Sequence, residues 1–209
     1  MKANLVLLGY AGHGTVVGES AIMQGHTLIG YTDSEPVKTN PLNLPYIGYE
    51  REAAFEWRYD VAYILGVGDN SIRAEMWDRV EKKGGQLATI VHPQALISTY
   101  SSIGTGTFIA RGAAINPNTT IGKGAIINTG AIVDHDCLIG DFVHIAPGTT
   151  LAGSVRIGSH TFVGANTVIR DGVTIGSQVV IGAGSVVVKD VPDQEWVWGN
   201  PARKQQKHR

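Results

Sequence analysis

The sequence predicts two folds in one chain: an α/β domain with a parallel sheet over residues 1–90, and a parallel β-helix over residues 91–209. In the first ninety residues, short apolar runs alternate with helix-like segments. From residue 97 onward, a branched aliphatic recurs at every sixth position. The change of period near residue 90 therefore favours two domains over one.

The amino-terminal part contains four expected strands and three expected helices. The strands cover residues 4–9, 26–31, 61–67 and 86–91, and the helices cover residues 15–24, 49–57 and 71–83. Strands that alternate with helices are typical of a parallel sheet with covered faces, which binds ligands at the carboxyl ends of its strands.

The loop after the first strand, GYAGHG at residues 9–14, leads into a helix. Its glycines would let the backbone approach a phosphate at the helix start. It is not a full G-x-G-x-x-G, so a plain strand-to-helix turn is the alternative. Asp33 follows about 20 residues later, where an acidic side chain can accept a ribose hydroxyl. We therefore expect a Rossmann-like domain that holds a mononucleotide group, such as the one on an activated sugar.

The second part is predicted from its six-residue period. The period runs through Ile97, Ile103, Ile109, Ile115, Ile121, Ile127, Val133, Ile139, Ile145, Leu151, Ile157, Val163, Ile169, Ile175, Ile181 and Val187. Two residues before each member stands a small or β-branched residue. Strand positions two apart point the same way and can fill one narrow interior, whereas a helix would scatter this pattern around its surface. Six residues then form one side of a three-sided coil, and eighteen residues form one full coil. Each coil buries its apolar face by stacking on the next.

Composition limits the function. Seventeen basic residues nearly balance eighteen acidic ones, which argues against nucleic acid or an anionic membrane as partner. No apolar run is long enough to cross a membrane and the start does not have the form of a signal peptide, so we expect a cytoplasmic protein. The basic end, with Arg203, Lys204, Lys207 and Arg209, is expected to be a solvated tail. The single cysteine, Cys137, occupies a small-residue position and is expected to point inward.

A histidine between two acids is the strongest candidate for chemistry. His135 lies two residues past an inward aliphatic, near a corner, between Asp134 and Asp136. A neighbouring carboxylate would fix the imidazole tautomer and raise its basicity, as in a general base; the alternative is a solvated corner histidine. His144 lies nine residues on, half a coil away, so any site that uses both would be built between subunits. His92 and His160 are expected to be ordinary surface or boundary residues.

These motifs together resemble a bacterial acetyltransferase of the PglD/NeuD type. The resemblance runs almost end to end and rests on GYAGHG, YTDS, GVGDNSIR, IVHPQALIS, INTGAIVDHDCLIGDFVHIAPG and GNPAR. It implies a left-handed β-helix, a homotrimer with acetyl-CoA bound between neighbouring prisms, and an amino-terminal domain that holds a nucleotide-linked sugar. It implies no metal.

The resemblance also assigns residues. His135 would be the general base, and Asp136, where relatives often have glutamate, would raise its basicity. The acetyl-CoA groove would be lined by His144 and the backbone around Gly153, Ala165 and Ala183. The nucleotide-sugar contacts would be Ala11, Gly12, His13, Asp33, Ser34, Gly68 and, as an additional anion partner, Arg73. Ser34 replaces a second aspartate of some relatives, which leaves the preference for base or sugar open.

We therefore expect an acetyl-CoA-dependent N-acetyltransferase that acts on a UDP- or GDP-linked amino sugar by direct transfer. Two alternatives remain open at this point. The same scaffold could acetylate a hydroxyl of sialic acid or of a surface polysaccharide, or it could bind a nucleotide sugar without turnover.

Overall fold

The structure is a computed structural model that describes residues 2–205. These residues form two compact units, with the boundary between Pro93 and Gln94. Two residues of the expected basic tail, Lys207 and Arg209, lie outside the described residues.

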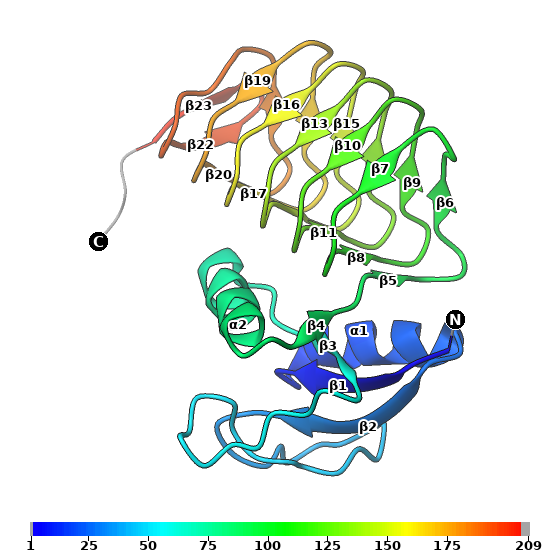
Figure 1. Ribbon diagram of the computed structural model, residues 1–209. Coiled ribbons are helices and arrows are strands. Elements are labelled where there is room, and N and C mark those ends of the chain that lie inside the picture. Colours follow the sequence, from blue (N-terminus) through cyan, green and yellow to red (C-terminus); the bar gives the residue numbers. More distant parts are fainter. Residues whose placement is uncertain (1, 206–209) are drawn as a thin grey trace. The chain divides into compact units, whose positions relative to one another are not determined.

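The first unit is an α/β structure (Figure 1). Its elements are β1 (Asn4–Leu8), α1 (Gly12–Met23), β2 (Thr27–Thr32), β3 (Ala62–Leu65), α2 (Asn70–Lys82), β4 (Gln86–Leu87) and β5 (Ile90–Val91). Strands β2, β1, β3 and β4 form one parallel sheet in that order. The four hydrophobic residues 5–8 of the central strand β1 are fully buried, which explains why this strand reads as an unbroken apolar run rather than an alternating one.

The expected helix at residues 49–57 is absent, and this prediction is wrong. Turns occupy residues 50–54, and the backbone hydrogen bonds there span only three residues, from Glu52 to Tyr49 and from Phe55 to Glu52. The aromatic rings of this segment pack instead: Trp57 contacts both Phe55 and Tyr63, with centroids 5.2 and 5.3 Å apart. Contacts with β3 therefore override the local helix signal.

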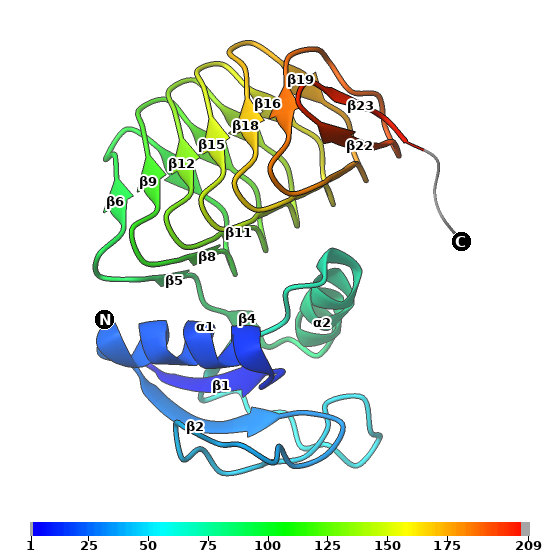
Figure 2. The ribbon, with the colours of Figure 1, turned by 180° about the vertical axis from the view of Figure 1, so that it is seen from behind.

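The second unit is a three-sided parallel β-helix, in which the strands of successive coils stack into three sheets, one on each side (Figures 1 and 2). Sheet I contains β6 (Leu96–Ile97), β9 (Ala114–Ile115), β12 (Ile132–Val133), β15 (Thr150–Leu151), β18 (Val168–Ile169) and β21 (Val186–Val187). Sheet II contains β7 (Ser102–Ile103), β10 (Thr120–Ile121), β13 (Leu138–Ile139), β16 (Arg156–Ile157) and β19 (Thr174–Ile175). Sheet III contains β8 (Phe108–Ile109), β11 (Ile126–Ile127), β14 (His144–Ile145), β17 (Phe162–Val163), β20 (Val180–Ile181), β22 (Trp196–Gly199) and β23 (Ala202–Lys204).

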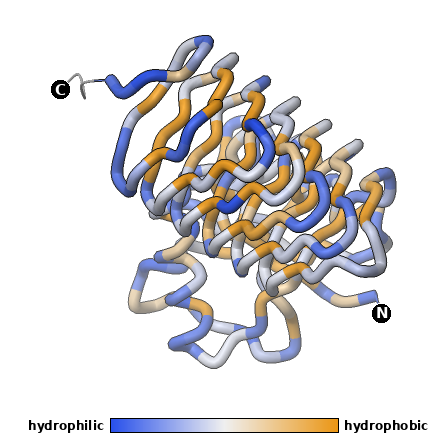
Figure 3. Tube along the Cα trace, turned by 90° about the horizontal axis from the view of Figure 1, so that it is seen from above, coloured by the Kyte–Doolittle hydropathy of each residue, from blue (hydrophilic) through white to orange (hydrophobic). Residues whose placement is uncertain are grey.

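The six-residue period fills the interior of this prism, as predicted. From β6 to β21, paired strands are offset by eighteen residues, so that Ile121 pairs with Ile139 and Ile127 with Ile145. From Ile109 to Val187, every member of the aliphatic series is at most 3% exposed. Figure 3 shows the hydrophobic residues recurring from coil to coil.

From Thr107 to Ser185, the small or β-branched residues two positions earlier are also buried, and the hydroxyls among them find partners. The Oγ1 atoms of Thr107 and Thr149 donate to the carbonyls of Gly122 and Gly164, at 2.9 and 3.0 Å. A threonine can therefore replace alanine in this column without leaving a buried hydroxyl unpaired.

A column of glycines follows the aliphatic at every third repeat, and its cause is close packing rather than corner conformation. An added Cβ on Gly104, Gly140 or Gly158 would lie 2.5–2.7 Å from backbone atoms of the next coil. None of these three has a positive φ. Other glycines provide the left-handed corners, for example Gly130 at φ 66° and Gly172 at φ 70°.

The expectation of a solvated basic tail is wrong for Arg203 and Lys204. Ala202–Lys204 form β23, which pairs antiparallel with β22. Lys204 Nζ lies 2.5 Å from Glu195 Oε1. Arg203 and Lys204 are therefore part of an ordered hairpin.

Candidate functional site

The corner between sheets I and II carries the acidic and histidine residues predicted for chemistry. His135 follows β12, and its backbone N–H donates to Asp134 Oδ1 at 2.8 Å. His135 Nδ1 lies 2.7 Å from Asp136 Oδ2, and about half of each side chain is exposed. Because an ionised carboxylate only accepts hydrogen bonds, Nδ1 carries the proton and Nε2 of the neutral ring keeps its lone pair. The corner therefore presents an oriented base rather than a freely solvated histidine.

Two asparagines of the preceding coil hold these acids, and sequence reasoning missed both. Asn116 Nδ2 donates to Asp134 Oδ1 at 2.6 Å, and Asn118 Nδ2 donates to Asp136 Oδ1 at 3.1 Å. Each asparagine stands eighteen residues before its acid, so the repeat itself contained the signal.

The surrounding charges tune the imidazole. The hydrogen bond to Asp136, followed by the charge of Asp134, raises the pKa of His135. In return, hydrogen bonds from His135 and then Asn118 hold the pKa of Asp136 below its usual value. The Asn116 amide and the His135 backbone N–H lower the pKa of Asp134. Two ionised carboxylates thus stabilise a proton on the ring, which strengthens it as a base.

The imidazole lies over a glycine of the next coil. An added Cβ on Gly153 would lie 2.6 Å from His135 Cε1, 2.8 Å from His135 Nε2 and 3.0 Å from Asp171 Oδ1. The charge of Asp171 also contributes to the raised pKa of His135. The structure therefore brings Gly153 to His135, and it adds Asp171, which sequence reasoning did not single out.

The other residues expected at an acetyl-CoA groove lie elsewhere in the coil. His144 is on sheet III, which confirms that the two histidines occupy different sides of one prism. His144 is 8% exposed; its Nε2 lies 3.1 Å from Asn128 Nδ2, and its ring meets the ring of Phe162 edge-on at 5.2 Å.

Ala165 and Ala183 stack on successive coils at the corner between sheets III and I. The carbonyl of Ala165 accepts a bond from the Gly184 N–H at 2.8 Å. An added Cβ on Gly164 would meet the backbone nitrogen of Ala183 at 2.5 Å. The four expected acetyl-CoA residues are thus distributed over two corners and one sheet of a single chain.

A pocket in the first unit gathers most of the predicted nucleotide contacts. Its volume of ≈ 570 Å³ lies within the range of small-molecule sites. Its lining residues are Tyr10, Ala11, Gly12, Thr15, Asp33, Ser34, Glu35, Pro36, Val37, Lys38, Thr39 and Pro41. The segment from Glu35 onward was not predicted to contribute.

Asp33 fixes the shape of this pocket. Its Oδ2 accepts the N–H of Tyr10 at 3.0 Å, and its Oδ1 accepts the N–H of Ser34 at 2.8 Å. Helix α1 begins beside it at Gly12, and the N-cap residue Ala11 offers no side-chain hydrogen bond. The first-turn N–H groups and the helix dipole therefore favour an anion at this edge.

Three of the predicted nucleotide residues do not line this pocket. His13 lies in the first turn of α1 and is partly buried. Gly68 accepts a hydrogen bond from Arg73 Nη1 at 3.0 Å, and Arg73 Nη2 donates to Asn70 Oδ1 at 2.8 Å. Arg73 is 1% exposed, and burial lowers its pKa to about 10. Arg73 therefore holds the loop after β3 from inside and does not line this pocket; its role as an anion partner stays a prediction.

The remaining cysteine and histidine side chains, Cys137, His92 and His160, are held by packing within the fold. Cys137 points inward as predicted: it is fully buried, its Sγ donates to the carbonyl of Ala152, and burial raises its pKa to about 11. The thiol is therefore protonated near neutral pH and is not a nucleophile. His92 is buried, and the ring of His160 stacks on that of Phe142 at 5.3 Å.

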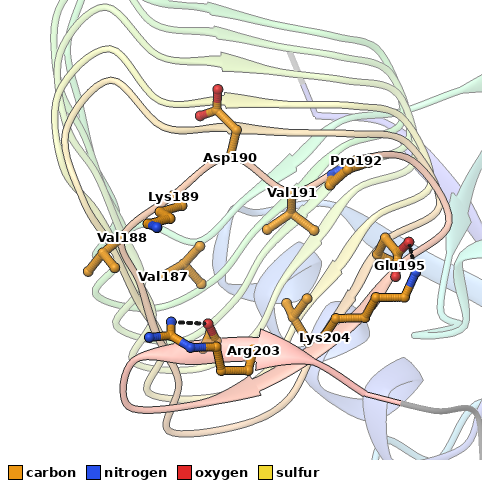
Figure 4. A pocket seen from close by; sticks show the side chains of 11 residues that line it. Val187, Val188, Lys189, Asp190, Val191, Pro192, Glu195, Arg203 and Lys204 are labelled. Atoms are coloured by element: carbon orange, nitrogen blue, oxygen red, sulfur yellow. Dashed lines mark hydrogen bonds and ion pairs between the residues drawn. The ribbon is translucent and has the colours of Figure 1, made fainter.

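A second hollow of ≈ 480 Å³ lies at the carboxy-terminal end of the β-helix (Figure 4). Its walls combine the valines at positions 187, 188, 191 and 197 with the ion pair of Glu195 and Lys204. None of the predicted site residues lines it. Among residues 2–205, no helix is long and apolar enough to cross a membrane, and no cluster of three metal-ligating side chains occurs.

Comparison with known proteins places both units in known families. Residues 4–80 match the family model of the PglD N-terminal domain. Residues 118–153 and 154–189 match the model of the bacterial transferase hexapeptide (six repeats). The UDP-N-acetylbacillosamine N-acetyltransferase of Bacillus subtilis (strain 168) is 34% identical over 109 residues, which cover 51% of this chain and 50% of that relative. The chain thus matches about half the length of that relative.

Solved structures match over nearly the whole chain. The acetyltransferase domain of PglB from Neisseria gonorrhoeae FA1090 is 34% identical, with a TM-score of 0.91 over 98% of this chain and 100% of that one. The same domain has been solved in complex with acetyl coenzyme A. PerB from Caulobacter crescentus, in complex with CoA and GDP-perosamine, is 35% identical, with a TM-score of 0.88 over 97% of each chain. These matches show that the β-helix is left-handed.

Proposed function

Because the chain belongs to the PglD-like family of hexapeptide-repeat acetyltransferases, we propose that it transfers the acetyl group of acetyl-CoA to the amino group of a nucleotide-linked amino sugar. The observation that carries this proposal is the oriented His135–Asp136 pair, at 2.7 Å. Relatives solved with acetyl-CoA and with GDP-perosamine support the two substrates. The pocket beside α1, with its anion-favouring helix start, would hold the nucleotide.

The proposed reaction is a direct transfer. The amine nitrogen attacks the thioester carbonyl while Nε2 of His135 accepts the proton that the amine loses. Backbone N–H groups stabilise the tetrahedral oxyanion. When this intermediate collapses, the carbon–sulfur bond breaks and the CoA sulfur leaves with the proton returned by the imidazolium. The amide and free CoA thiol are the products, and no acyl-enzyme forms.

We propose a homotrimer as the working form, with acetyl-CoA between neighbouring prisms. An apolar column on the outward face of sheet I supports this assembly: Leu96, Ala114, Ile132, Thr150, Val168 and Val186. Leu96, Ile132 and Val168 are 71, 41 and 46% exposed in the single chain. The column adjoins the His135 corner, so a neighbour packed on it would close the site. A cytoplasmic location and a role in making acetamido sugars for surface glycans stay predictions.

Turnover by a matched pair of histidine variants tests the catalytic role. Free thiol is measured after mixing enzyme, acetyl-CoA and either GDP-perosamine or a UDP-linked 4-amino sugar. His135→Asn should lose on the order of 10²–10⁴ in rate with little change in acetyl-CoA affinity. His160→Asn, at another corner of the same prism, should keep wild-type turnover. Near-normal turnover by His135→Asn would remove this residue from the mechanism.

The product distinguishes the rival functions. Mass spectrometry after hydroxylamine treatment separates an amide, which survives, from an ester, which is cleaved. An ester product would show O-acetylation. Thiol that never exceeds the enzyme-free background, with any acceptor, would show a binding protein without turnover.

The assembly is tested by adding one charge at two places. Ile132→Lys places an ammonium on the apolar column, and burial of that charge in an interface should break the trimer and abolish turnover. Gln86→Lys adds the same charge at an exposed position of strand β4 and should change neither the trimer nor the turnover. The proposal would be contradicted by a wild-type protein that is monomeric in light scattering and fully active in the thiol assay.

A further inference from the structure

One amide in the coil before the His135 corner has no role in the mechanism described above. Asn118 Nδ2 donates to Asp136 Oδ1 at 3.1 Å, while Asp136 Oδ2 lies 2.7 Å from His135 Nδ1. Each oxygen of the carboxylate therefore has its own partner, one on the ring and one on the neighbouring coil. From this geometry we infer that Asn118 is a positioning residue for the acetyl transfer: it locks the Asp136 carboxylate in the orientation that aims the His135 imidazole.

The backbone explains how Asn118 reaches its target. Asn118 and Asp136 have φ angles of 60° and 59°, in the left-handed conformation that asparagine, aspartate and glycine tolerate best. Because they occupy the same corner position in consecutive coils, their side chains leave the backbone in the same direction. The amide is thus placed directly against the acid.

The corner itself does not require an asparagine. The two following coils have Ser154 and Gly172 at the same position, with φ angles of 60° and 70°. The β-helix therefore builds this corner with other residues, and the amide stands next to the one carboxylate that contacts the imidazole. Neither Ser154 nor Gly172 carries a side-chain amide.

Removing the amide should loosen the carboxylate. With only the bond to His135 left, Asp136 can rotate about its side-chain torsions and satisfy both oxygens with water. The imidazole would then lose a fixed partner, and its pKa should fall toward the ordinary value of about 6.5. The other charged groups that act on this ring, Asp134 and Asp171, would remain in place.

The test uses glycine because it removes the side chain and keeps the left-handed backbone. We expect Asn118→Gly to lower kcat by about 10-fold, less than loss of the base itself. NMR titration of the His135 ring carbon, assigned by comparison with His135→Asn, should show a lower pKa than wild type. Gln178→Gly is the matched control, because Gln178 has a φ of 57° at an exposed corner of another column. It should leave both quantities unchanged.

A second variant reverses the direction of the shift. Asn118→Asp keeps the shape of the side chain but replaces the donor by a negative charge, which should raise the pKa of His135 by attraction while kcat still falls. A purely structural role would lower the stability of both variants and leave the titration of His135 unmoved. An unchanged kcat or an unchanged His135 pKa in Asn118→Gly overturns the inference.

This inference rests on the proposed acetyl transfer, and the two can fail separately. The titration needs no substrate, so the link from Asn118 through Asp136 to His135 is measured even on a protein that acetylates nothing. If no amino sugar is acetylated, the proposed function fails, and with it the catalytic part of the inference. If turnover is normal and Asn118→Gly matches wild type in kcat and in titration, the inference alone is wrong.

Discussion

Gly153→Ala should disable the enzyme without unfolding it. The new Cβ would lie 2.6 Å from His135 Cε1 and 2.8 Å from its Nε2. Non-bonded carbon atoms prefer about 3.5–4.0 Å, so the ring must move by about 1 Å. A misplacement of this size costs about 10²-fold in rate. We therefore expect kcat, measured by thiol release, to fall by about two orders of magnitude.

The same substitution should have little effect on stability. Gly153 does not have a positive φ, so alanine adopts its backbone without strain. The His135 side chain is 54% exposed and can swing outward. The reduced freedom of the unfolded chain contributes about 0.4–1 kcal/mol of stabilisation. The free energy of unfolding from urea titration should therefore stay within about 1 kcal/mol of wild type.

A double variant separates this effect from a direct effect on acetyl-CoA. If Gly153→Ala acts by displacing the imidazole, it should cause no further loss in a His135→Asn background, because both changes then remove one function. An additional loss there would show that Gly153 acts through another contact. Activity of Gly153→Ala within threefold of wild type would refute the reasoning, because the base would then work without the orientation described here.

Three further predictions concern pH, the buried thiol and the coil packing. Because its neighbours raise the pKa of His135 and a general base must be neutral, kcat/KM should fall on acidification with an apparent pKa above about 6.5; Asp136→Asn should move this limb to lower pH. An acid limb that Asp136→Asn leaves in place would contradict this. Since the pKa of Cys137 is raised to about 11, an alkylating reagent at pH 8 should label the thiol in urea and spare it in the native protein, as measured by mass; rapid native labelling would show an open site. In Gly158→Ala, the added Cβ would lie 2.5 Å from the backbone nitrogen of Ser177, so the coils must separate and urea unfolding should show a loss of about 1–3 kcal/mol; an unchanged midpoint would disprove the packing argument.

The two units differ in how much of their site the sequence could predict. In the β-helix, an offset of eighteen residues becomes a contact between neighbouring coils, so the partnership of Asn118 with Asp136 was available from the sequence. In the α/β unit, contacts follow no period. The bond of Arg73 to the backbone of its own loop, outside the pocket that gathers Asp33 and Ser34, could not be predicted from the sequence. The helix expected at residues 49–57 was likewise displaced by packing of Trp57 on Tyr63.

By itself, the sequence determined the three-sided coil, the inward aliphatics and the corner position of His135, because strand alternation and a six-residue period are local properties that every coil repeats. Only the tertiary structure decided which atoms meet at that corner. Which oxygen of Asp136 accepts from Asn118 and which faces His135, and the placement of the ring over Gly153, depend on the distance and direction between successive coils. Those quantities arise from the packing of the whole prism and are absent from any single repeat.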